Sequence, residues 1–330
     1  MDLRSDTVTR PSAAMRRAMA EAEVGDDAYG EDPTVRRLEE AYAERVGKEA
    51  GLFLASGTLA NQVALRAQAP AGTAVVAGRT SHVARYEEGA TGVLQVAQLL
   101  TVDDDAGRPD PAAVAEAVQG AAHHGVPPSL VCVEDTHMRA GGVPLDDGVV
   151  PSLAGSGVPV HVDGARLFNA EVATGVPAAE RVAAATTVWT ALSKGLGAPV
   201  GSVLAGPAAV VDETRAWRRR FGGQLRQAGV LAAAGLVGLA AVDRLADDHA
   251  RAARLARAVA DRWPEALDPA AVRTNLVVFP HHDPDAVLAH LAASGVLAGT
   301  VAPRTLRLVT SLEVDDDGVD RACRALATAP

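Results

Sequence analysis

Aromatic residues, cysteines and long apolar runs are scarce in this sequence. Phe, Trp and Tyr make up only 3% of the 330 residues, so alanine, valine and leucine must fill the hydrophobic core. Two cysteines, Cys132 and Cys323, are too few for a disulfide scaffold or a thiolate metal site. The longest uncharged stretch of the alanine-rich region, residues 227–242, is shorter than the roughly 20 residues of a membrane span. The first residues contain no apolar signal core, so we expect a cytoplasmic protein with no membrane partner.

Positive charge is also scarce. The formal net charge is −10 and no long basic run occurs, which argues against a nucleic-acid partner and against an anionic membrane surface. Apolar residues make up 48% of the chain and charged residues 22%, which is the balance of an ordinary globular protein. This composition excludes disorder and coiled coil as the main organisation.

Lysine is nearly absent, since only Lys48 and Lys194 occur among 31 basic residues. An amine can lose its proton and form an imine, whereas a guanidinium stays charged. Lys194 follows an apolar run typical of a buried strand, and open parallel sheets bind ligands beyond the ends of their strands. Lys48 instead follows the helix-ending Gly47, as a solvated lysine commonly does. If either lysine forms an imine we expect Lys194, although by itself Lys194 could also be an ordinary loop residue.

Short apolar runs alternate with helical segments, which predicts an α/β fold with a mainly parallel sheet. The predicted strands are residues 51–54, 73–77, 129–134, 158–162, 188–192 and 201–205. Helices are predicted at 33–46, after residue 57, at 112–122, 145–154 and 178–185, after Pro207, and at 227–263 with a break near 243–249.

The end of the chain repeats a strand–helix–strand–helix pattern, with strands at 274–279 and 305–312 and helices at 284–294 and 316–327. This pattern predicts a separate, small α+β domain. The expected division is an N-terminal arm at 1–22, a large domain at 23–243 and a small domain at 244–330.

Polar residues follow several predicted strands, at the edge where a parallel sheet forms its binding site. Asp163 follows the strand at 158–162. A carboxylate there would suit the protonated nitrogen of a pyridine cofactor, or it would merely cap the helix that follows. His82 and His137 follow two other strands and are candidate catalytic residues, although a lone histidine is more often structural.

The turn Ser56-Gly57-Thr58 stands at a predicted helix start, where N–H groups and the helix dipole favour an anion such as a cofactor phosphate. Many helix starts have this composition, and no Gly-Lys-Ser/Thr follows as in a P-loop. Residues 195–201 (GLGAPVG) have the wrong spacing for a dinucleotide fingerprint, and Pro199 prevents a helix there. No His-Glu-x-x-His pattern occurs, so we expect no catalytic metal.

Four segments carry a family resemblance that covers nearly the whole chain in order. They are residues 3–9 (LRSDTVT), 24–34 (VGDDAYGEDPT), 161–169 (HVDGARLFN) and 192–202 (LSKGLGAPVGS). In these segments the sequence resembles the low-specificity L-threonine aldolases, which are fold-type I pyridoxal-phosphate (PLP) enzymes. The resemblance implies that fold, with a large domain around a mainly parallel sheet and a small C-terminal α+β domain.

The resemblance also implies roles for matching residues. Lys194 would form a Schiff base with PLP, Asp163 would pair with the ring nitrogen and Arg166 would lie near the phenolic oxygen of the ring. His82 would stack on the ring and stand near the substrate hydroxyl, with His137 as a second active-site histidine.

Further contacts are implied for the cofactor, the substrate and a second subunit. The remaining cofactor contacts are Ser56, Gly57, Thr58, Ser193 and Arg226, and the substrate contacts are Ser5, Tyr29, Arg166 and Arg307. Tyr29 and Arg226 match residues that the family places near a cofactor at a dimer interface. The implied assembly is a homo-oligomer with a dimer as its minimal unit and a tetramer as the expected form.

The sequence departs from the family pattern at a few positions. Asp135 and Met138 stand where the family usually has Asn beside its histidine motif, Gln224 replaces the third of three glycines, and Ser311 replaces a frequent histidine. Residues 303–307 offer both Arg304 and Arg307 for the substrate carboxylate, and the sequence leaves that choice open.

The implied reaction is the PLP-dependent cleavage of L-threonine, L-allo-threonine and related β-hydroxy-α-amino acids to glycine and an aldehyde. The nearest alternative is β-elimination or transamination of a small amino acid on the same fold. A non-catalytic binding protein that retains the fold is an alternative of a different class.

Overall fold

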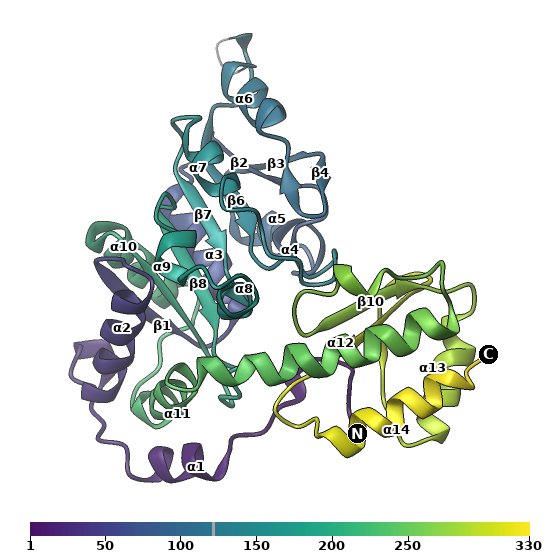
Figure 1. Cartoon of the computed structure of the whole chain (residues 1–330). Coiled ribbons are helices and arrows are strands. Elements are labelled where there is room, and N and C mark those ends of the chain that lie inside the picture. Colours follow the sequence, from purple (N-terminus) through teal and green to yellow (C-terminus); the bar gives the residue numbers. More distant parts are fainter. Residues whose placement is uncertain (121–122) are drawn as a thin grey trace.

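Figure 1 shows a large α/β body and, at its lower right, a smaller group of strands and helices that lies near both ends of the chain. The computed structural model describes residues 1–120 and 123–330. The order of elements along the chain follows the predicted alternation of strands and helices.

The large body is built on a seven-stranded sheet in the order β1-β9-β8-β7-β6-β2-β3. The strands from β8 to β3 are parallel, and β9 is antiparallel to both of its neighbours. The prediction of a mainly parallel sheet is therefore confirmed. The strand bounds are Ala50–Leu54 (β1), Ala74–Gly78 (β2), Gln98–Val102 (β3), Pro128–Glu134 (β6), Val160–Asp163 (β7), Thr187–Ala191 (β8) and Ser202–Gly206 (β9).

Edge strand β3 was not predicted from the sequence. Its side chains are only partly buried, and Gln98 and Thr101 are exposed. The segment therefore lacks the continuous apolar run that reveals the fully buried strands β2, β8 and β9. A short hairpin, β4 (Asp104–Asp105) with β5 (Arg108–Pro109), follows it.

The predicted helix starts are confirmed at α2 (Pro33–Arg45) and α3 (Gly57–Gln68). Asp32 caps α2, since its Oδ1 accepts hydrogen bonds from the N–H groups of Thr34 and Val35. Ser56 caps α3 through the N–H of Leu59. The other helices of the large body are α1 (Ala13–Ala20), α4 (His82–Arg85), α5 (Ala90–Leu94), α6 (Pro111–Gly120), α7 (Val149–Ala154), α8 (Leu167–Thr174), α9 (Ala178–Arg181), α10 (Ala208–Arg220) and α11 (Gly229–Leu239).

Some predicted helices differ in extent from the observed ones. The last two residues of the predicted helix 112–122 lie outside the described residues, and α7 and α9 are shorter than predicted. The predicted helix 227–263 is two helices, because α11 ends at Leu239 and α12 (Leu245–Arg262) begins after the 3-10 turn Val242–Arg244. The predicted break near 243–249 is therefore confirmed, although it begins a few residues earlier, after Leu239.

The smaller group contains a three-stranded antiparallel sheet in the order β10-β12-β11. Its elements are β10 (Leu276–Pro280), α13 (Pro284–Ala293), β11 (Gly299–Ala302), β12 (Thr305–Val309) and α14 (Asp316–Ala327). The α+β prediction is confirmed, with β11 as an additional strand that was not predicted.

The two parts have separate groups of buried apolar residues. One group lies around the large sheet and includes Met15 and Leu245, whereas the other lies around β10, α12 and α14 and includes Leu3. The N-terminal segment therefore contacts both cores. Leu245 packs in the core of the large sheet although it follows residue 244, and the predicted domain boundaries stay a prediction.

In the described ranges no single helix has both the length and the apolar character needed to cross a membrane. Only α11 together with Val242–Arg262 reaches that length and composition, and these two segments meet at an angle of 61°.

Candidate active site

A pocket of about 310 Å³ lies at the carboxyl ends of the central strands. Glu134 ends β6, Asp163 ends β7, and Lys194 follows β8 in the loop that leads to β9. The topology therefore brings these side chains to one edge of the sheet, as the parallel arrangement predicts. The lining residues are Thr7, Ala55, Ser56, Gly57, Thr58, His82, Glu134, Met138, Asp163, Ala165, Arg166, Trp189, Ser193, Lys194, Pro199, Val200 and Gly201.

The two lysines have different surroundings. Lys194 Nζ lines the pocket and forms neither a hydrogen bond nor an ion pair with any residue that the structure describes. Burial and the nearby Arg166 guanidinium lower the pKa of the Lys194 amine to about 8. Lys48 Nζ instead donates to the carbonyl oxygens of Val182, Ala183 and Ala185, so the prediction that Lys48 is solvated is wrong. Of the two, only Lys194 has an amine available for an imine.

Asp163 is the last residue of β7 and is almost fully buried. Its Oδ2 accepts a hydrogen bond from Asn61 Nδ2 at 2.8 Å, and its Oδ1 accepts the N–H of Ala165 at 3.2 Å. The carboxylate thus bonds the turn after β7, but α8 begins at Leu167 with Arg166 as its N-cap residue, so Asp163 does not cap that helix. Asp163 also lines the pocket, and its pairing with a pyridine nitrogen stays a prediction.

His82 begins α4 and has a carboxylate on each side. Its Nδ1 lies 2.9 Å from Glu87 Oε1, and its backbone N–H donates to Glu134 Oε2 at 2.9 Å. Burial opposes a charge on the ring, yet the bond to Glu87 and the nearby carboxylates raise the pKa of His82 above its usual value. Tyr86 lies beside the ring at 5.8 Å between centroids.

Arg166 is fixed by a buried ion pair that the sequence did not reveal. Its Nε and Nη2 each lie 2.7 Å from the carboxylate of Asp6, in the bidentate arrangement that favours strong pairing. Asp6 is fully buried, which disfavours its charge, but Arg166 still lowers the pKa of Asp6 to about 2. Asn275 of the small domain also donates to Asp6, so this pair connects three distant segments.

The turn at Ser56-Gly57-Thr58 lies against Trp189. A Cβ at Gly57 would lie 2.4 Å from Trp189 Cη2, so only glycine fits at this position without movement of the ring. The first N–H groups of α3 have no partner within the helix, and the positive end of its dipole lies at the pocket. The turn is therefore suited to an anion.

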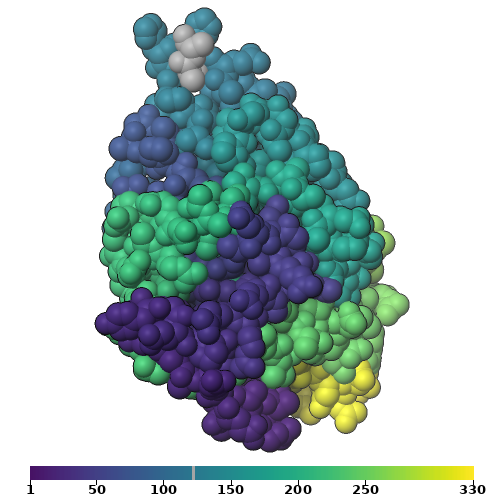
Figure 2. All heavy atoms as spheres, turned by 90° about the vertical axis from the view of Figure 1, so that its left-hand side faces the viewer, coloured from purple at the N-terminus to yellow at the C-terminus, as the bar shows by residue number. Residues whose placement is uncertain are grey.

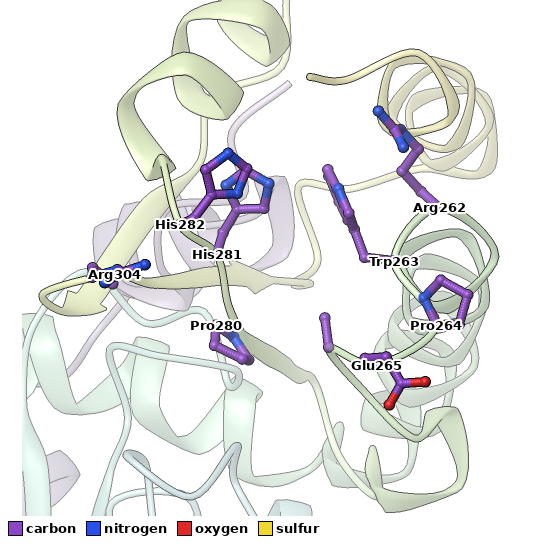
Figure 3. A pocket seen from close by; sticks show the side chains of 9 residues that line it. Arg262, Trp263, Pro264, Glu265, Pro280, His281, His282 and Arg304 are labelled. Atoms are coloured by element: carbon purple, nitrogen blue, oxygen red, sulfur yellow. The ribbon is translucent and has the colours of Figure 1, made fainter.

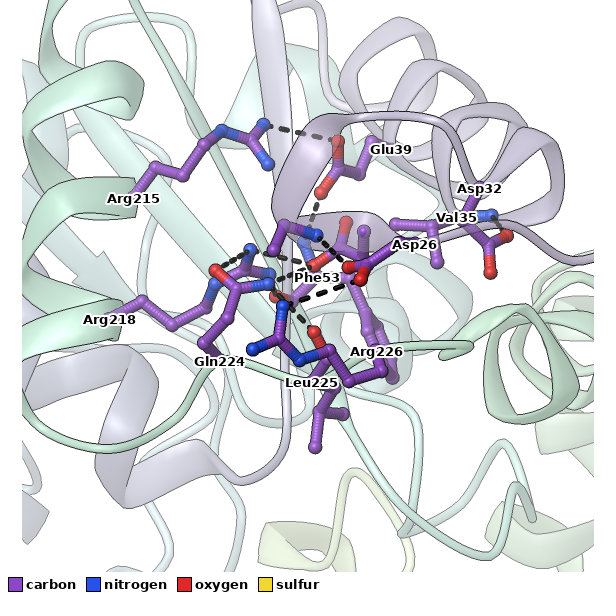
Figure 4. A network of polar contacts seen from close by, with 12 residues as sticks. Asp26, Asp32, Val35, Glu39, Phe53, Arg215, Arg218, Gln224, Leu225 and Arg226 are labelled. Carbon is purple, nitrogen blue, oxygen red and sulfur yellow. Dashed lines mark hydrogen bonds and ion pairs between the residues drawn. The ribbon is translucent and has the colours of Figure 1, made fainter.

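Of the predicted site residues, Ser5, Tyr29, His137, Arg226 and Arg307 do not line the pocket, and Tyr29 and Arg226 lie on the surface. Tyr29 is 78% exposed, and Arg226 pairs with Asp26 at 3.3 Å on the surface. Figure 4 shows Arg226 beside Gln224, which donates to Asp27 while Arg218 binds both Asp27 and Gln224. The Gln224 departure is thus part of a polar network that holds the Arg226 segment.

Ser5 and His137 are close to the pocket but do not line it. Ser5 caps the 3-10 turn Asp6–Val8, where its Oγ accepts the N–H of Thr7. His137 is buried, its Nδ1 accepts the N–H of Ala140, and its Nε2 lies 3.7 Å from Glu134 Oε2. His137 Nε2 also lies 3.4 Å from Thr80 Oγ1, so His137 stands behind Glu134, which lines the pocket.

The two arginines near residue 305 lie in different places. Arg307 on β12 donates to the carbonyl of Arg4 at 2.9 Å and lies 3.6 Å from Met138 Sδ at the pocket wall. Arg304 is exposed and lines a separate hollow of about 540 Å³ with Trp263 and His281 (Figure 3). That hollow shares no residue with the Lys194 pocket.

The other departures lie away from the pocket. Asp135 forms a buried ion pair with Arg181 at 2.8 Å and accepts the N–H of Leu145, so its extra charge is neutralised. The hydroxyl of Ser311 is buried and has no hydrogen-bond partner among the described residues. Of the departing residues, only Met138 lines the pocket.

Several residues of the site were not identified from the sequence. Glu134 stands at a strand end just as Asp163 does, so the same argument could have found it. Asn61 and Glu87 carry no such signal, because their contacts form only when α3, the segment after α4 and β7 meet. Asp6 lies in a matching segment, but its partner is 160 positions away.

One cluster of a histidine and two carboxylates has its possible ligand atoms close enough together to bind a metal ion. Ligand atoms of His82, Glu87 and Asp163 lie within 4.8 Å of one another. Hydrogen bonds between these residues and to Asn61 already account for this closeness. The geometry therefore requires no ion.

Comparisons with known proteins agree with this geometry. The sequence model of the family described as Beta-eliminating lyase matches residues 2–281. The low-specificity L-threonine aldolase 1 of Arabidopsis thaliana is 41% identical over 86% of this chain and 82% of its own length. The low specificity L-threonine aldolase of Escherichia coli (strain K12) is 38% identical over 95% of this chain and 94% of its own length.

Solved structures of other proteins have a fold similar to that of this chain. A threonine aldolase structure from Leishmania major has a TM-score of 0.83 with 19% identity and covers 98% of each chain. A serine palmitoyltransferase structure from Sphingomonas wittichii has a TM-score of 0.78 with 18% identity, over 99% of this chain and 86% of that one. The fold is therefore that of the fold-type I PLP enzymes, and the chain belongs to the beta-eliminating lyase family, where its relatives include low-specificity L-threonine aldolases.

Proposed function

We propose that the protein is a lyase that cleaves L-threonine, L-allo-threonine and related β-hydroxy-α-amino acids to glycine and an aldehyde, with PLP as its cofactor. The observation that carries the proposal is the amine of Lys194. It has no partner among the described side chains, its pKa is lowered to about 8, and it lies in a pocket with Asp163 and an anion-binding helix start.

The residues present fit PLP. Lys194 would hold its aldehyde carbon, Asp163 its ring nitrogen, and Ser56, Gly57, Thr58 and Ser193 its phosphate. The Gly57 position supports this, because a side chain there would overlap Trp189 beside the helix start. When bound, the cofactor supplies an electron sink for the pair released as the Cα–Cβ bond breaks.

Arg307 would hold the substrate carboxylate, together with Arg166 and Ser5. Arg307 Nε is buried without a hydrogen-bond partner in the described structure, and Arg307 forms no ion pair there, although the nearby Asp6 carboxylate favours its charge. Burial and Arg166 lower the pKa of Arg307, so a bound anion would relieve an unfavourable charge. Arg304 lacks this support, because it is exposed and lines the separate hollow.

His82 would accept the proton of the substrate hydroxyl, with His137 acting behind Glu134. A base must be neutral, and the pKa of His82 is raised by Glu87 and its neighbours, so cleavage should become faster as the pH rises above 6.5. His82→Phe separates two roles. A stacking role predicts that much of the rate is retained, whereas proton transfer predicts a loss of roughly 10²–10⁴-fold.

The test of the proposed reaction is an assay of the purified protein with L-threonine, L-allo-threonine and phenylserine. We expect equal amounts of aldehyde and glycine. Release of ammonia or of a keto acid in their place would identify β-elimination or transamination and overturn the proposal.

We also propose that the site is completed by a second copy of the chain, in a dimer or a tetramer, where Tyr29 and Arg226 reach the partner's cofactor. Figure 2 shows that the N-terminal segment in purple and the α10–α11 region in green meet on one face of the molecule. The exposed apolar residues Tyr29, Val24 and Val230 belong to these segments and support an interface there. Mixing inactive Lys194→Ala with inactive Arg226→Ala should then restore activity, whereas mixed oligomers that stay inactive would refute a shared site.

A cytoplasmic location remains part of the proposal. Cys132 and Cys323 are both unpaired, which fits a reducing compartment.

A further inference from the structure

Asn61 on α3 lies at the centre of a buried polar cluster beneath the pocket. Its side chain is fully buried, and its Nδ2 donates to Glu87 Oε1 at 2.6 Å and to Asp163 Oδ2 at 2.8 Å. Its Oδ1 lies 2.6 Å from Trp189 Nε1 and 3.2 Å from His161 Nε2. These contacts use both amide hydrogens and both lone pairs of the oxygen.

The chemistry of the neighbours fixes the orientation of this amide. The indole N–H of Trp189 can only donate, so it must face Oδ1, and ionised carboxylates only accept, so they must face Nδ2. His161 is neutral, because burial lowers its pKa to about 4. Its Nδ1 pairs with the hydroxyl of Thr187, which leaves Nε2 to donate to Asn61.

The donor side of Asn61 separates two like charges. Glu87 binds His82 Nδ1 at 2.9 Å, and Asp163 lines the pocket. The ligand atoms of these three residues lie within 4.8 Å of one another. Two carboxylates so close together in a buried site repel each other unless donors or cations lie between them.

We propose that Asn61 is a positioning residue, whose NH₂ group holds the Asp163 carboxylate and the Glu87–His82 pair together. This inference rests on the proposed use of PLP. Asp163 would face the ring nitrogen and His82 the ring plane, so Asn61 sets the position of one cofactor contact relative to the other.

The amide oxygen of Asn61 makes a different contact, because it accepts the indole N–H of Trp189. It holds Trp189, whose ring lies under Gly57 at the proposed phosphate turn, only 2.4 Å from the place that a Cβ at Gly57 would occupy. A variant that keeps the oxygen and changes only the donor therefore separates positioning of the charged groups from support of the tryptophan.

Asn61→Asp is that variant. Its Oδ1 can still accept from Trp189 and His161, while its second oxygen replaces the NH₂ donor. The titratable groups around it are Glu87 and Asp163 in direct contact, His161 on the acceptor side and His82 beyond Glu87. Glu134 and Cys132 on the neighbouring strand β6 lie near the two carboxylates. With three carboxylates together, the cluster binds an extra proton as the pH falls, and the resulting O–H can donate again.

The readout is the dissociation constant of PLP for the cofactor-free protein, measured by quenching of tryptophan fluorescence at pH 8 and pH 6. The value of each variant is divided by the parental value at the same pH. We expect Asn61→Asp to bind PLP roughly 10- to 100-fold more weakly at pH 8, the effect of losing a charge-assisted hydrogen bond, and to recover at pH 6. Asn61→Leu, which cannot donate at either pH, should be weakened without recovery.

Gln62→Glu is the matched control. Gln62 is on the same helix, is equally buried, and donates to Glu87 Oε2 but not to Asp163. We expect it to weaken PLP binding less than Asn61→Asp. An equal loss in both variants would mean that any added carboxylate near Glu87 is sufficient, which would overturn the role of Asn61.

Two further outcomes would also overturn the inference. One is parental PLP binding by Asn61→Asp at both pH values, and the other is an equal loss at both pH values, which would indicate a purely structural role. If the parental protein itself does not bind PLP, the proposed function fails, and this result is distinguishable from failure of the Asn61 inference alone.

Discussion

The ion pair between Asp6 and Arg166 gives the sharpest prediction about stability. Asp6 is completely buried, each of its oxygens lies 2.7 Å from a guanidinium nitrogen, and Asn275 donates to it at 3.2 Å. Asp6→Asn keeps the shape of the side chain, but its NH₂ group then faces a donor of Arg166. The variant therefore leaves a buried cation without its partner.

The magnitude follows from the pKa of Asp6, which is lowered from 3.8 to about 2 although burial opposes the charge. At about 1.4 kcal/mol for each tenfold change in proton affinity, the charged state adds roughly 2.5 kcal/mol to the free energy of unfolding. Removing one partner of a buried ion pair typically lowers the free energy of unfolding by about 3–5 kcal/mol, because the other charge stays buried without a partner. We therefore expect Asp6→Asn to lower the free energy of unfolding by about 2.5–5 kcal/mol at pH 7.

The sign of the pH dependence is also fixed. Because the pKa of Asp6 is lower in the folded protein than in the unfolded chain, the stabilisation is complete above the unfolded value of 3.8 and disappears as the pH falls through about 2. The difference between parent and variant should therefore shrink only below about pH 4.

Urea unfolding followed by circular dichroism at pH 7, 5 and 3 measures this difference. Asp2→Asn is the control, because Asp2 pairs with the exposed Arg4, and it should leave the urea midpoint nearly unchanged. An Asp6→Asn variant that unfolds at the parental midpoint at pH 7 would refute the reasoning.

Four further outcomes are expected. Lys194→Ala should lose turnover, and borohydride reduction should no longer attach PLP covalently to the chain. Covalent attachment of PLP to Lys48 in this variant would contradict the assignment of Lys194. The rate of PLP attachment to the parent should rise about tenfold per pH unit up to the pKa of Lys194, about 8, and then level off, because only the neutral amine attacks. A rate that keeps rising at the same slope from about pH 8 to 10 would disprove the lowered amine pKa. Asp163→Asn should lower turnover far more than stability, and parental turnover at saturating PLP would show that its charge is not needed. Gly57→Ala should lower the free energy of unfolding by about 1–3 kcal/mol, since its Cβ would meet Trp189 at 2.4 Å, whereas Gly92→Ala, with open space at its Cβ, should not.

Local signals in the sequence determined most of the elements and singled out Lys194 as the candidate imine-forming residue. The buried strand β2 is a continuous apolar run, and Asp32 with Pro33 marks the start of α2 by its own hydrogen bonds. Lys194 stood out because the sequence has only one other lysine, and Asp163 because it follows a strand. Each of these signals lies within a few residues of the feature that it predicts.

The tertiary structure decided what depends on residues far apart in the chain. Arg166 is paired because Asp6, 160 positions earlier, is buried beside it, and Lys48 is engaged because the carbonyls after α9 surround its amine. The edge strand β3 escaped detection because partial exposure removes its apolar pattern. Arg307 and Arg304 look alike in the sequence. In the structure, Arg307 lies on β12 beside Met138, whereas Arg304 precedes β12 and lines the separate hollow. Asn61 has no local signal, since its role comes from four partners that only the folded sheet and helices bring to one amide.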